Sequence, residues 1–279
     1  MTTTHAFSPI VKVAHRGASF EAPENTRTAF RRAIEQGADL IETDVHRTAD
    51  GVLVLVHDDT LERTTNVREV FPGRTSYAVA DFTWDELQQL DAGSWKGTEF
   101  AGERIPSLAQ FLDLLQGCRT GLLLEVKDPT LYPGMAADLV AVLEASEQFV
   151  EPALVSGKLI VQSFHWDFVR EFHALMPAVP VGYLALPEWE PHAEDAAWLA
   201  TYNPYYRAAS PELMERVHEL GMRSFPWTVN EPEEMHAVLD AGADGIITDK
   251  PLVLEQVVRE REARAAGAAG AGVPGAAVA

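Results

Sequence analysis

The segment QGADLIETD, residues 36–44, occurs a second time in similar form as AGADGIITD, residues 241–249. Each copy has the pattern of a helix end, a glycine-containing turn and a short apolar strand. Internal similarity of this kind is expected when a fold is built from repeated units of one strand and one helix. Because Ile247 stands in the second copy where Glu42 stands in the first, the repeated unit does not itself require an acid there.

Strand and helix patterns alternate along most of the chain. The apolar runs predicted to be strands are 10–14, 40–45, 121–126, 158–162, 179–184 and 244–247, with weaker candidates at 198–202 and 222–226. The amphipathic patterns predicted to be helices are 26–36, 106–116, 135–146, 166–175, 210–220 and 231–241. Because eight strands that alternate with helices over about 250 residues are typical of a (β/α)8 barrel, we predict an α/β fold of the TIM-barrel type.

One interval between the predicted elements is too long for a simple connection. The strand at 40–45 is followed by the turn Asp50-Gly51 and a second apolar run, but the next helix begins only near residue 106. The residues in between, 58–104, predict a small inserted subdomain after the second strand. Loops at this end of the strands form the active-site mouth of such barrels, so we expect the insertion to lie over the mouth.

The predicted domain covers residues 9–262. The remaining residues, 263–279, are almost all Ala and Gly and have little side chain to bury, so they are predicted to be a disordered tail. A helical continuation is the alternative, since Ala favours helix.

The chain is strongly acidic, with a net charge of −20 from 22 basic and 42 acidic side chains. Nucleic-acid binding depends on Lys and Arg contacts to phosphate, so no nucleic-acid partner is expected. The N-terminal sequence lacks the pattern of a secretory signal, and no apolar run approaches the length of a membrane span. The single cysteine, Cys118, excludes an internal disulfide and is interpreted as a packed small residue. We therefore expect a cytoplasmic protein without a stable membrane anchor.

Three acidic side chains fall at the ends of predicted strands. Glu42 and Asp44 are two positions apart, so they share one face of a strand, about 6.6–7 Å apart along it. Glu125 ends the strand at 121–126. Three carboxylates suit a hard cation such as Mg²⁺ or Ca²⁺, whereas zinc more often takes His or Cys. The alternative for Glu42 and Asp44 is that they are exposed strand-end acids or partners of a nearby arginine.

Basic side chains accompany the acids. The first strand ends in His15 and Arg16, and the hairpin strand ends in His57. Histidine is the natural acid or base near neutral pH, and arginine suits bidentate phosphate contact. Lys127 shares a strand face with Glu125 and presents a point charge for a phosphate, or forms a plain ion pair. Each histidine has a structural alternative.

This set of residue types matches the needs of phosphoester cleavage. One histidine can take a proton from the nucleophile while the other protonates the leaving oxygen, and each such transfer contributes roughly 10²–10⁴ in rate. A cation can polarise the phosphoryl oxygens. His46, two positions beyond Asp44, is interpreted as mainly structural.

Several short motifs together resemble the glycerophosphodiester phosphodiesterase family. They are His15-Arg16-Gly17, Pro23-Glu24-Asn25-Thr26, residues 37–45, Asp50-Gly51, His57-Asp58, Glu125-Val126-Lys127, Gln162-Ser163-Phe164, residues 227–230 and residues 245–251. The match runs from about residue 11 to 255. The resemblance implies a TIM barrel with a small insertion and hydrolysis of glycerophosphodiesters to an alcohol and sn-glycerol 3-phosphate. It also implies one divalent cation, Mg²⁺ or Ca²⁺.

Carried over by position, the resemblance also implies a role for individual residues. The implied metal ligands are Glu42, Asp44 and Glu125, the implied acid–base pair is His15 and His57, and the implied substrate-binding residues are Arg16, Lys127 and Trp227. A packed core tryptophan is the alternative for Trp227. Asn25 or Thr26 is expected to cap the helix at 26–36. A contact of Asn25 with the site is the alternative, but helix capping already explains this residue.

Two other functions fit the same residues. The first is a lysophospholipase D-type phosphodiesterase, which would need an apolar groove near the mouth. Aromatic residues of the insertion either line such a groove or form the core of the insertion; they are Phe71, Tyr77, Phe82, Trp84, Trp95 and Phe100. The lack of a membrane anchor counts against this function. The second is a barrel that only binds a metal or a phosphodiester, although such barrels usually lack one of the residues found here.

Overall fold

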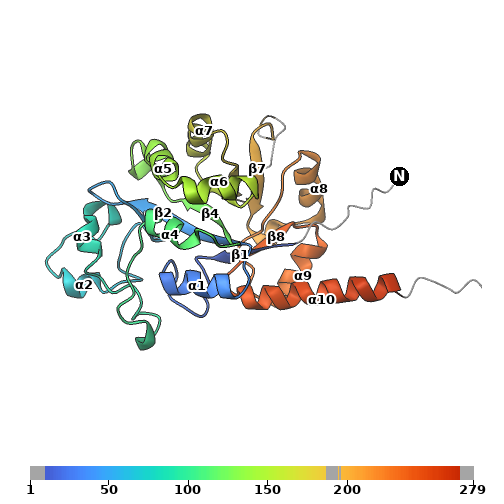
Figure 1. Ribbon diagram of the computed structural model, residues 1–279, viewed down its shortest axis with the longest axis horizontal. Helices are drawn as coiled ribbons and strands as arrows, with labels where there is room; N and C mark the ends of the chain where they lie inside the picture. The colour runs from blue at the N-terminus through green and yellow to red at the C-terminus, as the bar shows by residue number, and fades with distance from the viewer. Residues whose placement is uncertain (1–9, 187–193, 195, 271–279) are drawn as a thin grey trace, which may run out of the picture.

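Seven parallel strands form the centre of the molecule. The computed structural model describes residues 10–186, 194 and 196–270 (Figure 1). The strands are β1 (Val11–His15), β2 (Leu40–Arg47), β4 (Gly121–Val126), β5 (Leu159–Ser163), β6 (Val181–Ala185), β7 (Leu199–Pro204) and β8 (Gly245–Thr248). Their order is β7-β6-β5-β4-β2-β1-β8, and each neighbouring pair is parallel. The predicted α/β fold is confirmed.

The predicted strand at 222–226 is wrong as a regular strand, because this segment makes only isolated bridges. It nevertheless lies between β7 and β8. Tyr202 N donates to Arg223 O at 2.9 Å on one side, and Ile247 N donates to Pro226 O at 3.0 Å on the other. Pro226 has no N–H to donate, so a continuous ladder cannot form through it. The ring of strands is therefore closed by an irregular segment.

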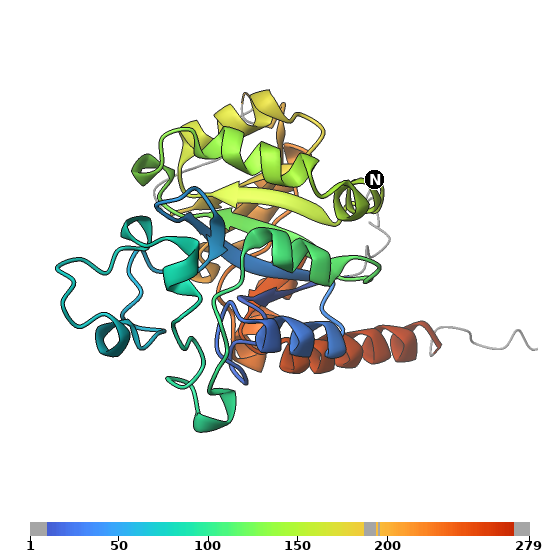
Figure 2. The same ribbon diagram turned by 60° about the vertical axis from the view of Figure 1, so that its left-hand side comes forward.

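Helices cover the outer side of the strands (Figures 1 and 2). They are α1 (Arg27–Glu35), α4 (Leu108–Leu115), α5 (Met135–Glu144), α6 (Glu147–Val155), α7 (Trp166–Leu175), α8 (Pro211–Glu219), α9 (Pro232–Asp240) and α10 (Pro251–Gly270). Side chains cap several of them: Thr26 accepts from Ala29 N, and Ser107 forms a reciprocal capping box with Gln110. Helix α6 has no counterpart among the predicted elements.

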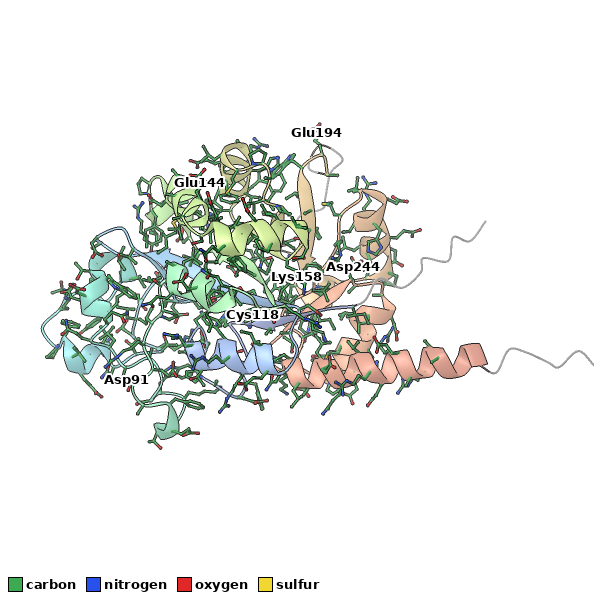
Figure 3. The ribbon with its side chains drawn as sticks, viewed as in Figure 1. Asp91, Cys118, Glu144, Lys158, Glu194 and Asp244 are labelled. Carbon is green, nitrogen blue, oxygen red and sulfur yellow. The ribbon has the colours of Figure 1, made fainter. Side chains whose placement is uncertain are left out.

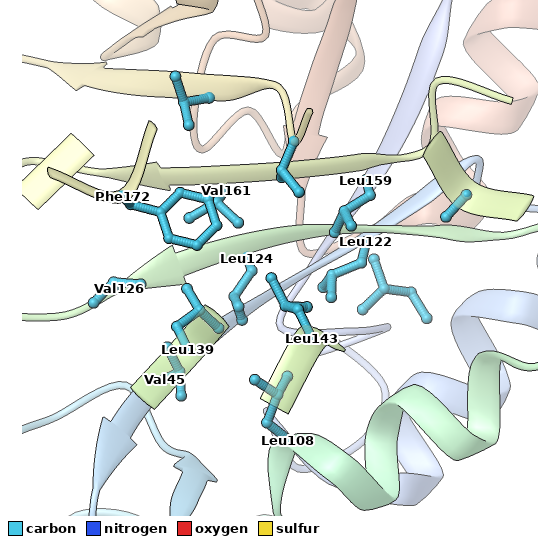
Figure 4. Packing of buried hydrophobic residues seen from close by; sticks show 14 of the residues in the cluster. Val45, Leu108, Leu122, Leu124, Val126, Leu139, Leu143, Leu159, Val161 and Phe172 are labelled. Atoms are coloured by element: carbon cyan, nitrogen blue, oxygen red, sulfur yellow. The ribbon is translucent and has the colours of Figure 1, made fainter. Parts of the chain in front are cut away.

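The alternation of side chains along each strand divides the core into two layers. Leu122 and Leu124 point outward and pack under the helices with residues such as Leu139 and Phe172 (Figure 4). Leu123, between them, belongs to a smaller cluster inside the ring of strands. That inner cluster consists of Val13, Leu40, Leu123, Ile160, Phe225 and Ile247. Because side chains alternate along a strand, the next inward-facing positions towards the carboxyl ends of the strands lie directly above this apolar cluster.

The insertion leaves the barrel after β2. Strand β3 (Leu53–Leu55) pairs antiparallel with β2, and the chain then forms α2 (Val67–Val70), α3 (Trp84–Leu87) and two short turns, Val79–Asp81 and Thr98–Phe100. Two further short turns, Pro129–Leu131 and Tyr206–Ala208, lie in the barrel. The insertion sits to one side of the barrel (Figure 2) and has its own hydrophobic cluster. This cluster contains Val54, Val56, Leu61, Val67, Val79, Phe82, Leu87, Leu90, Ala92 and Ile105.

Aromatic residues of the insertion serve mainly as its core. Phe82 is fully buried, and Phe71, Tyr77 and Trp84 pack against the same cluster. Phe100 belongs to a separate small cluster with two alanines at the barrel. These five side chains are therefore part of packed clusters, whereas Trp95 is 40% exposed and donates its Nε1 proton to Ala92 O at 2.9 Å.

Two other expectations differ from the structure. Helix α10 continues to Gly270, so residues 263–270 are helical, which is the alternative that the alanine content favours; residues 271–279 lie outside the described residues. Cys118 is exposed between α4 and β4, so its interpretation as a packed residue is wrong (Figure 3). Across residues 10–186, 194 and 196–270, no helix has the length and apolar character to span a membrane.

A turn that follows β1 gives a test of the fold. Gly17 has φ +83°, and a Cβ there would lie 2.7 Å from the Ala29 carbonyl carbon, whereas Gly37 has φ +77° and nothing within 4 Å. Gly37→Ala should cost about 1–2 kcal/mol for its left-handed backbone. Gly17→Ala should cost a further ~1–3 kcal/mol of overpacking. Urea unfolding of the two variants measures the difference, and equal losses would contradict the close approach of α1.

Candidate active site

The three predicted metal ligands converge at the carboxyl ends of β2 and β4. The strand register places His15 opposite Glu42 and Asp44 opposite Glu125. Because all four positions face into the barrel, one ligand oxygen from each of the three acids lies within 4.8 Å of the others. The three acids are buried, with exposed fractions of 0–7 %. The structure thus brings Glu125 next to Glu42 and Asp44, from which it is far apart in the sequence.

The donor set fits a hard divalent cation. Glu42 Oε1 and Asp44 Oδ1 are buried and have no hydrogen-bond partner among the described residues. Leaving such atoms unpaired is costly, and carboxylate oxygens are the ligands that Mg²⁺ and Ca²⁺ prefer. The site therefore offers carboxylate oxygens as ligands, and a bound cation would give these unpaired oxygens a partner.

Two cationic side chains flank the three acids. Arg16 Nε lies 3.2 Å from Asp44 Oδ2, and Lys127 Nζ lies 2.6 Å from Glu125 Oε1 and 3.8 Å from Asp44 Oδ1. When all three acids are ionised, as cation binding requires, three carboxylates against the two cationic side chains leave one net negative charge. A divalent cation would turn this into one net positive charge. Although the chain as a whole is acidic, the site can then attract a phosphate anion.

The three carboxyl groups titrate differently because their neighbours differ. Burial by itself would raise the pKa of Asp44, but Arg16 and Lys127 outweigh it and lower that pKa to about 2. Burial, and next the Asp44 charge, raise the pKa of Glu125 to about 7. The same two causes raise the pKa of Glu42 well above its ordinary value. Asp44 is therefore the permanent anion of the three.

His15 is held by an aspartate from the second copy of the repeat. Its Nδ1 lies 2.6 Å from Asp249 Oδ1, while its Nε2 lies 4.0 Å from Glu42 Oε2. Asp249 also accepts from Asn230 Nδ2 at 2.7 Å and from Ser19 Oγ at 2.9 Å. Nδ1 is thus engaged, and Nε2 faces the acids. The position of Asp249 in the repeat matches that of Asp44, which is a signal that sequence reasoning did not use.

His57 has a similar arrangement on the other side. Its Nδ1 lies 2.6 Å from Asp58 Oδ1, so Nε2 is the atom left for the site. Burial lowers the pKa of His57, and the nearby positive charge of Arg16 acts in the same direction. His46 Nδ1 bonds to the Tyr132 hydroxyl at 2.8 Å, and its Nε2 lies 3.2 Å from the His57 carbonyl oxygen. The buried His46 thus holds the backbone of His57 and does not enter the cavity.

Asn25 contributes differently from the expectation. Thr26 is the residue that caps α1. Asn25 Nδ2 donates to Asp44 Oδ2 at 2.9 Å, and its Oδ1 accepts from the Thr43 hydroxyl at 2.7 Å. Of the two capping candidates Thr26 is therefore the cap, and the helix-capping explanation of Asn25 is wrong. The alternative, a contact with the site, is what the structure has: Asn25 orients Asp44.

A cavity of about 170 Å³ opens beside these groups. Its lining consists of His15, Arg16, Glu42, His57, Glu125, Lys127, Gln162, Phe164, Leu184, Trp227, Thr228 and Ile247. Trp227 donates its Nε1 proton to Asn203 O at 2.8 Å, and the Phe164 ring meets its ring edge-on at 5.3 Å. The cavity therefore has one charged wall and one apolar wall. All eight predicted site residues lie at this place, and Gln162, to which the sequence assigned no role, lies there too.

Comparison with known proteins agrees with this geometry. The model of the glycerophosphoryl diester phosphodiesterase family matches residues 15–253. The chain belongs to this family. A glycerophosphodiester phosphodiesterase of Caldanaerobacter subterraneus subsp. tengcongensis is 39% identical over 253 residues, which cover 89% of this chain and 97% of that protein. One from Bacillus subtilis is 33% identical over 262 residues, covering 89% and 86%.

Solved structures support the same conclusion. An Oleispira antarctica phosphodiesterase, determined in complex with the product sn-glycerol-3-phosphate, has a TM-score of 0.78 at 27% identity, covering 91% of this chain and 98% of that one. A glycerophosphodiester phosphodiesterase from Agrobacterium tumefaciens has a TM-score of 0.70 at 26% identity, covering 88% and 98%. The predicted family, TIM-barrel fold and enzyme class are confirmed.

Cation binding at the acids should depend on pH. Because the pKa of Glu125 is raised to about 7 in the metal-free protein, a proton must leave before this oxygen can bind a cation. The apparent Kd for Mg²⁺ or Ca²⁺ should therefore rise as pH falls below 7, by at least about tenfold per pH unit, because the pKa of Glu42 is raised as well. Titration calorimetry between pH 8 and 6 measures this. An affinity that does not change over this range would contradict the pKa of Glu125.

Proposed function

We propose that the protein hydrolyses glycerophosphodiesters to an alcohol and sn-glycerol 3-phosphate with the help of one divalent cation, Mg²⁺ or Ca²⁺. The observation that supports this proposal most strongly is that two histidines, the cationic side chains of Arg16 and Lys127, and three buried carboxylates lie around one small cavity. The names of the relatives and the product bound in the Oleispira structure support the choice of substrate.

Glu42, Asp44 and Glu125 would hold the cation. When bound, such a cation polarises phosphoryl oxygens and offsets the charge that develops on them. Arg16 and Lys127 bind the remaining phosphate oxygens, since both line the cavity and carry the charge that a phosphate needs.

His15 and His57 act as the acid–base pair. A carboxylate engages Nδ1 of each ring, so Nε2 is the atom that exchanges a proton in both. One Nε2 accepts the proton of the attacking hydroxyl, and the other gives a proton to the oxygen of the leaving alcohol. The attacking hydroxyl belongs to water, or to glycerol if the route passes through a cyclic phosphate.

The apolar wall receives the carbon atoms of the substrate. Phe164, Leu184 and Trp227 form this wall, and the indole N–H of Trp227 already has a partner, so the ring offers only its apolar surface. A cavity of about 170 Å³ suits a small diester. Of the six aromatic side chains on which the lysophospholipid alternative depended, five are packed in clusters and Trp95 alone is exposed, so we prefer the small diester as substrate.

A substrate panel tests the proposal. Glycerophosphocholine, glycerophosphoethanolamine, glycerophosphoglycerol and lysophosphatidylcholine are each incubated with Mg²⁺, Ca²⁺ or EDTA, and released glycerol 3-phosphate and alcohol are measured. Turnover of at least one glycerophosphodiester is expected with a metal and is expected to stop with EDTA. No turnover of any glycerophosphodiester under any condition would overturn the proposal.

Histidine variants test the assigned roles. His15→Ala and His57→Ala should each lower kcat by roughly 10²–10⁴ with the fold retained, because each removes one proton transfer. His218→Ala is the matched control: this histidine pairs with Asp244, which precedes β8, at the opposite end of the barrel. Steady-state kinetics and circular dichroism measure both properties. Full activity in either active-site variant would remove that histidine from the mechanism.

A further inference from the structure

One arginine of the insertion, Arg63, donates hydrogen bonds to two carboxylates. It is not among the residues that line the cavity. Arg63 donates from Nε and Nη2 to the two oxygens of Asp58, at 2.7 and 2.9 Å. It also donates from Nη1 and Nη2 to the two oxygens of Glu24, at 2.9 and 2.8 Å. The planar guanidinium is suited to such paired contacts, whereas a lysine ammonium is not.

Each of these two carboxylates also contacts a residue of the active site. Asp58 Oδ1 lies 2.6 Å from His57 Nδ1. Glu24 Oε1 accepts from Arg16 Nη1 at 2.9 Å. Arg63 is therefore one side chain away from both a proposed proton-transfer group and a proposed phosphate-binding group.

Removal of Arg63 would change both contacts. Asp58 and Glu24 are like charges that share this guanidinium, so without it they would repel each other. Asp58 would lose the partner that fixes its orientation towards His57. Glu24 would keep only Arg16. A misplacement of about 1 Å in a reacting group can cost about 10²-fold in rate.

We infer that Arg63 is a positioning residue of the active site, which sets the spacing between His57 and Arg16 through Asp58 and Glu24. This inference rests on the proposed function. If Arg63 has this role, the insertion contributes to the active site in addition to forming its own hydrophobic core. The insertion carries the side chain that locks the loop after β1, where Glu24 lies, to the residue that follows His57.

Two variants and a matched control test this inference. Arg63→Ala should lower kcat/KM for the best glycerophosphodiester by about 10²-fold, with kcat lowered and KM raised. Arg63→Lys should recover only part of the loss. Arg68→Ala is the control: Arg68 is also in the insertion, its side chain is 71% exposed, and it pairs with Glu62 instead of with Asp58 or Glu24. It should stay within about twofold of the unchanged protein.

Double variants separate the effect that Arg63 has through Asp58 from the effect that it has through Glu24. With Asp58→Asn in place, Arg63→Ala should still raise KM but should no longer lower kcat further. With Glu24→Gln in place, Arg63→Ala should still lower kcat but should leave KM unchanged. Shared partners make such losses non-additive, whereas the loss from Arg68→Ala should simply multiply. A residue that only stabilises the fold would not produce this split.

The outcomes distinguish this inference from the proposed function. If the unchanged protein turns over no glycerophosphodiester, the proposed function fails. If it is active and Arg63→Ala lowers only the melting temperature, with kcat/KM within about twofold, the positioning role is overturned. If Arg63→Ala does not fold, Arg63→Lys and Arg63→Gln decide the matter by the same kinetics, and full activity in both would overturn the inference.

Discussion

Glu42, Asp44 and Glu125 are buried side by side, and the groups around them are arranged to offset their charge. Three carboxylates within 4.8 Å of one another repel and lose their hydration. Arg16 and Lys127 offset part of this cost, and Asn25 orients the acid that stays ionised. When all three are ionised, one negative charge remains in excess, and two oxygens have no partner among the described residues; a divalent cation relieves both conditions.

The outer contacts follow from the same arrangement. Each proposed acid–base histidine is turned by a carboxylate of its own, Asp249 for His15 and Asp58 for His57, so that Nε2 remains for the substrate. Strand alternation places these groups above the apolar cluster inside the ring of strands, and the insertion reaches back to them through Arg63. The fold therefore determines where the active-site side chains lie, and ion pairs with neighbouring residues determine how these side chains are oriented.

Much of this could be predicted from the sequence, because its signals are local. The two-residue spacing of Glu42 and Asp44 predicted a shared face, and the glycine turns predicted the repeated unit. The strand at 222–226 could not be predicted correctly, because the effect of Pro226 depends on neighbours at both sides. The partner of His15 was missed for a similar reason: Asp249 lies 234 residues away, and only the closed barrel brings the two together.

Diffraction from crystals grown with a metal shows whether the three acids form one cation site. Crystals grown with Mn²⁺ or Ca²⁺ would be measured for anomalous scattering. A single strong peak is expected about 2.0–2.6 Å from oxygens of Glu42, Asp44 and Glu125. A map without a peak at this place at millimolar metal, or with a peak held by other residues while the three acids remain paired only with Arg16 and Lys127, would contradict it.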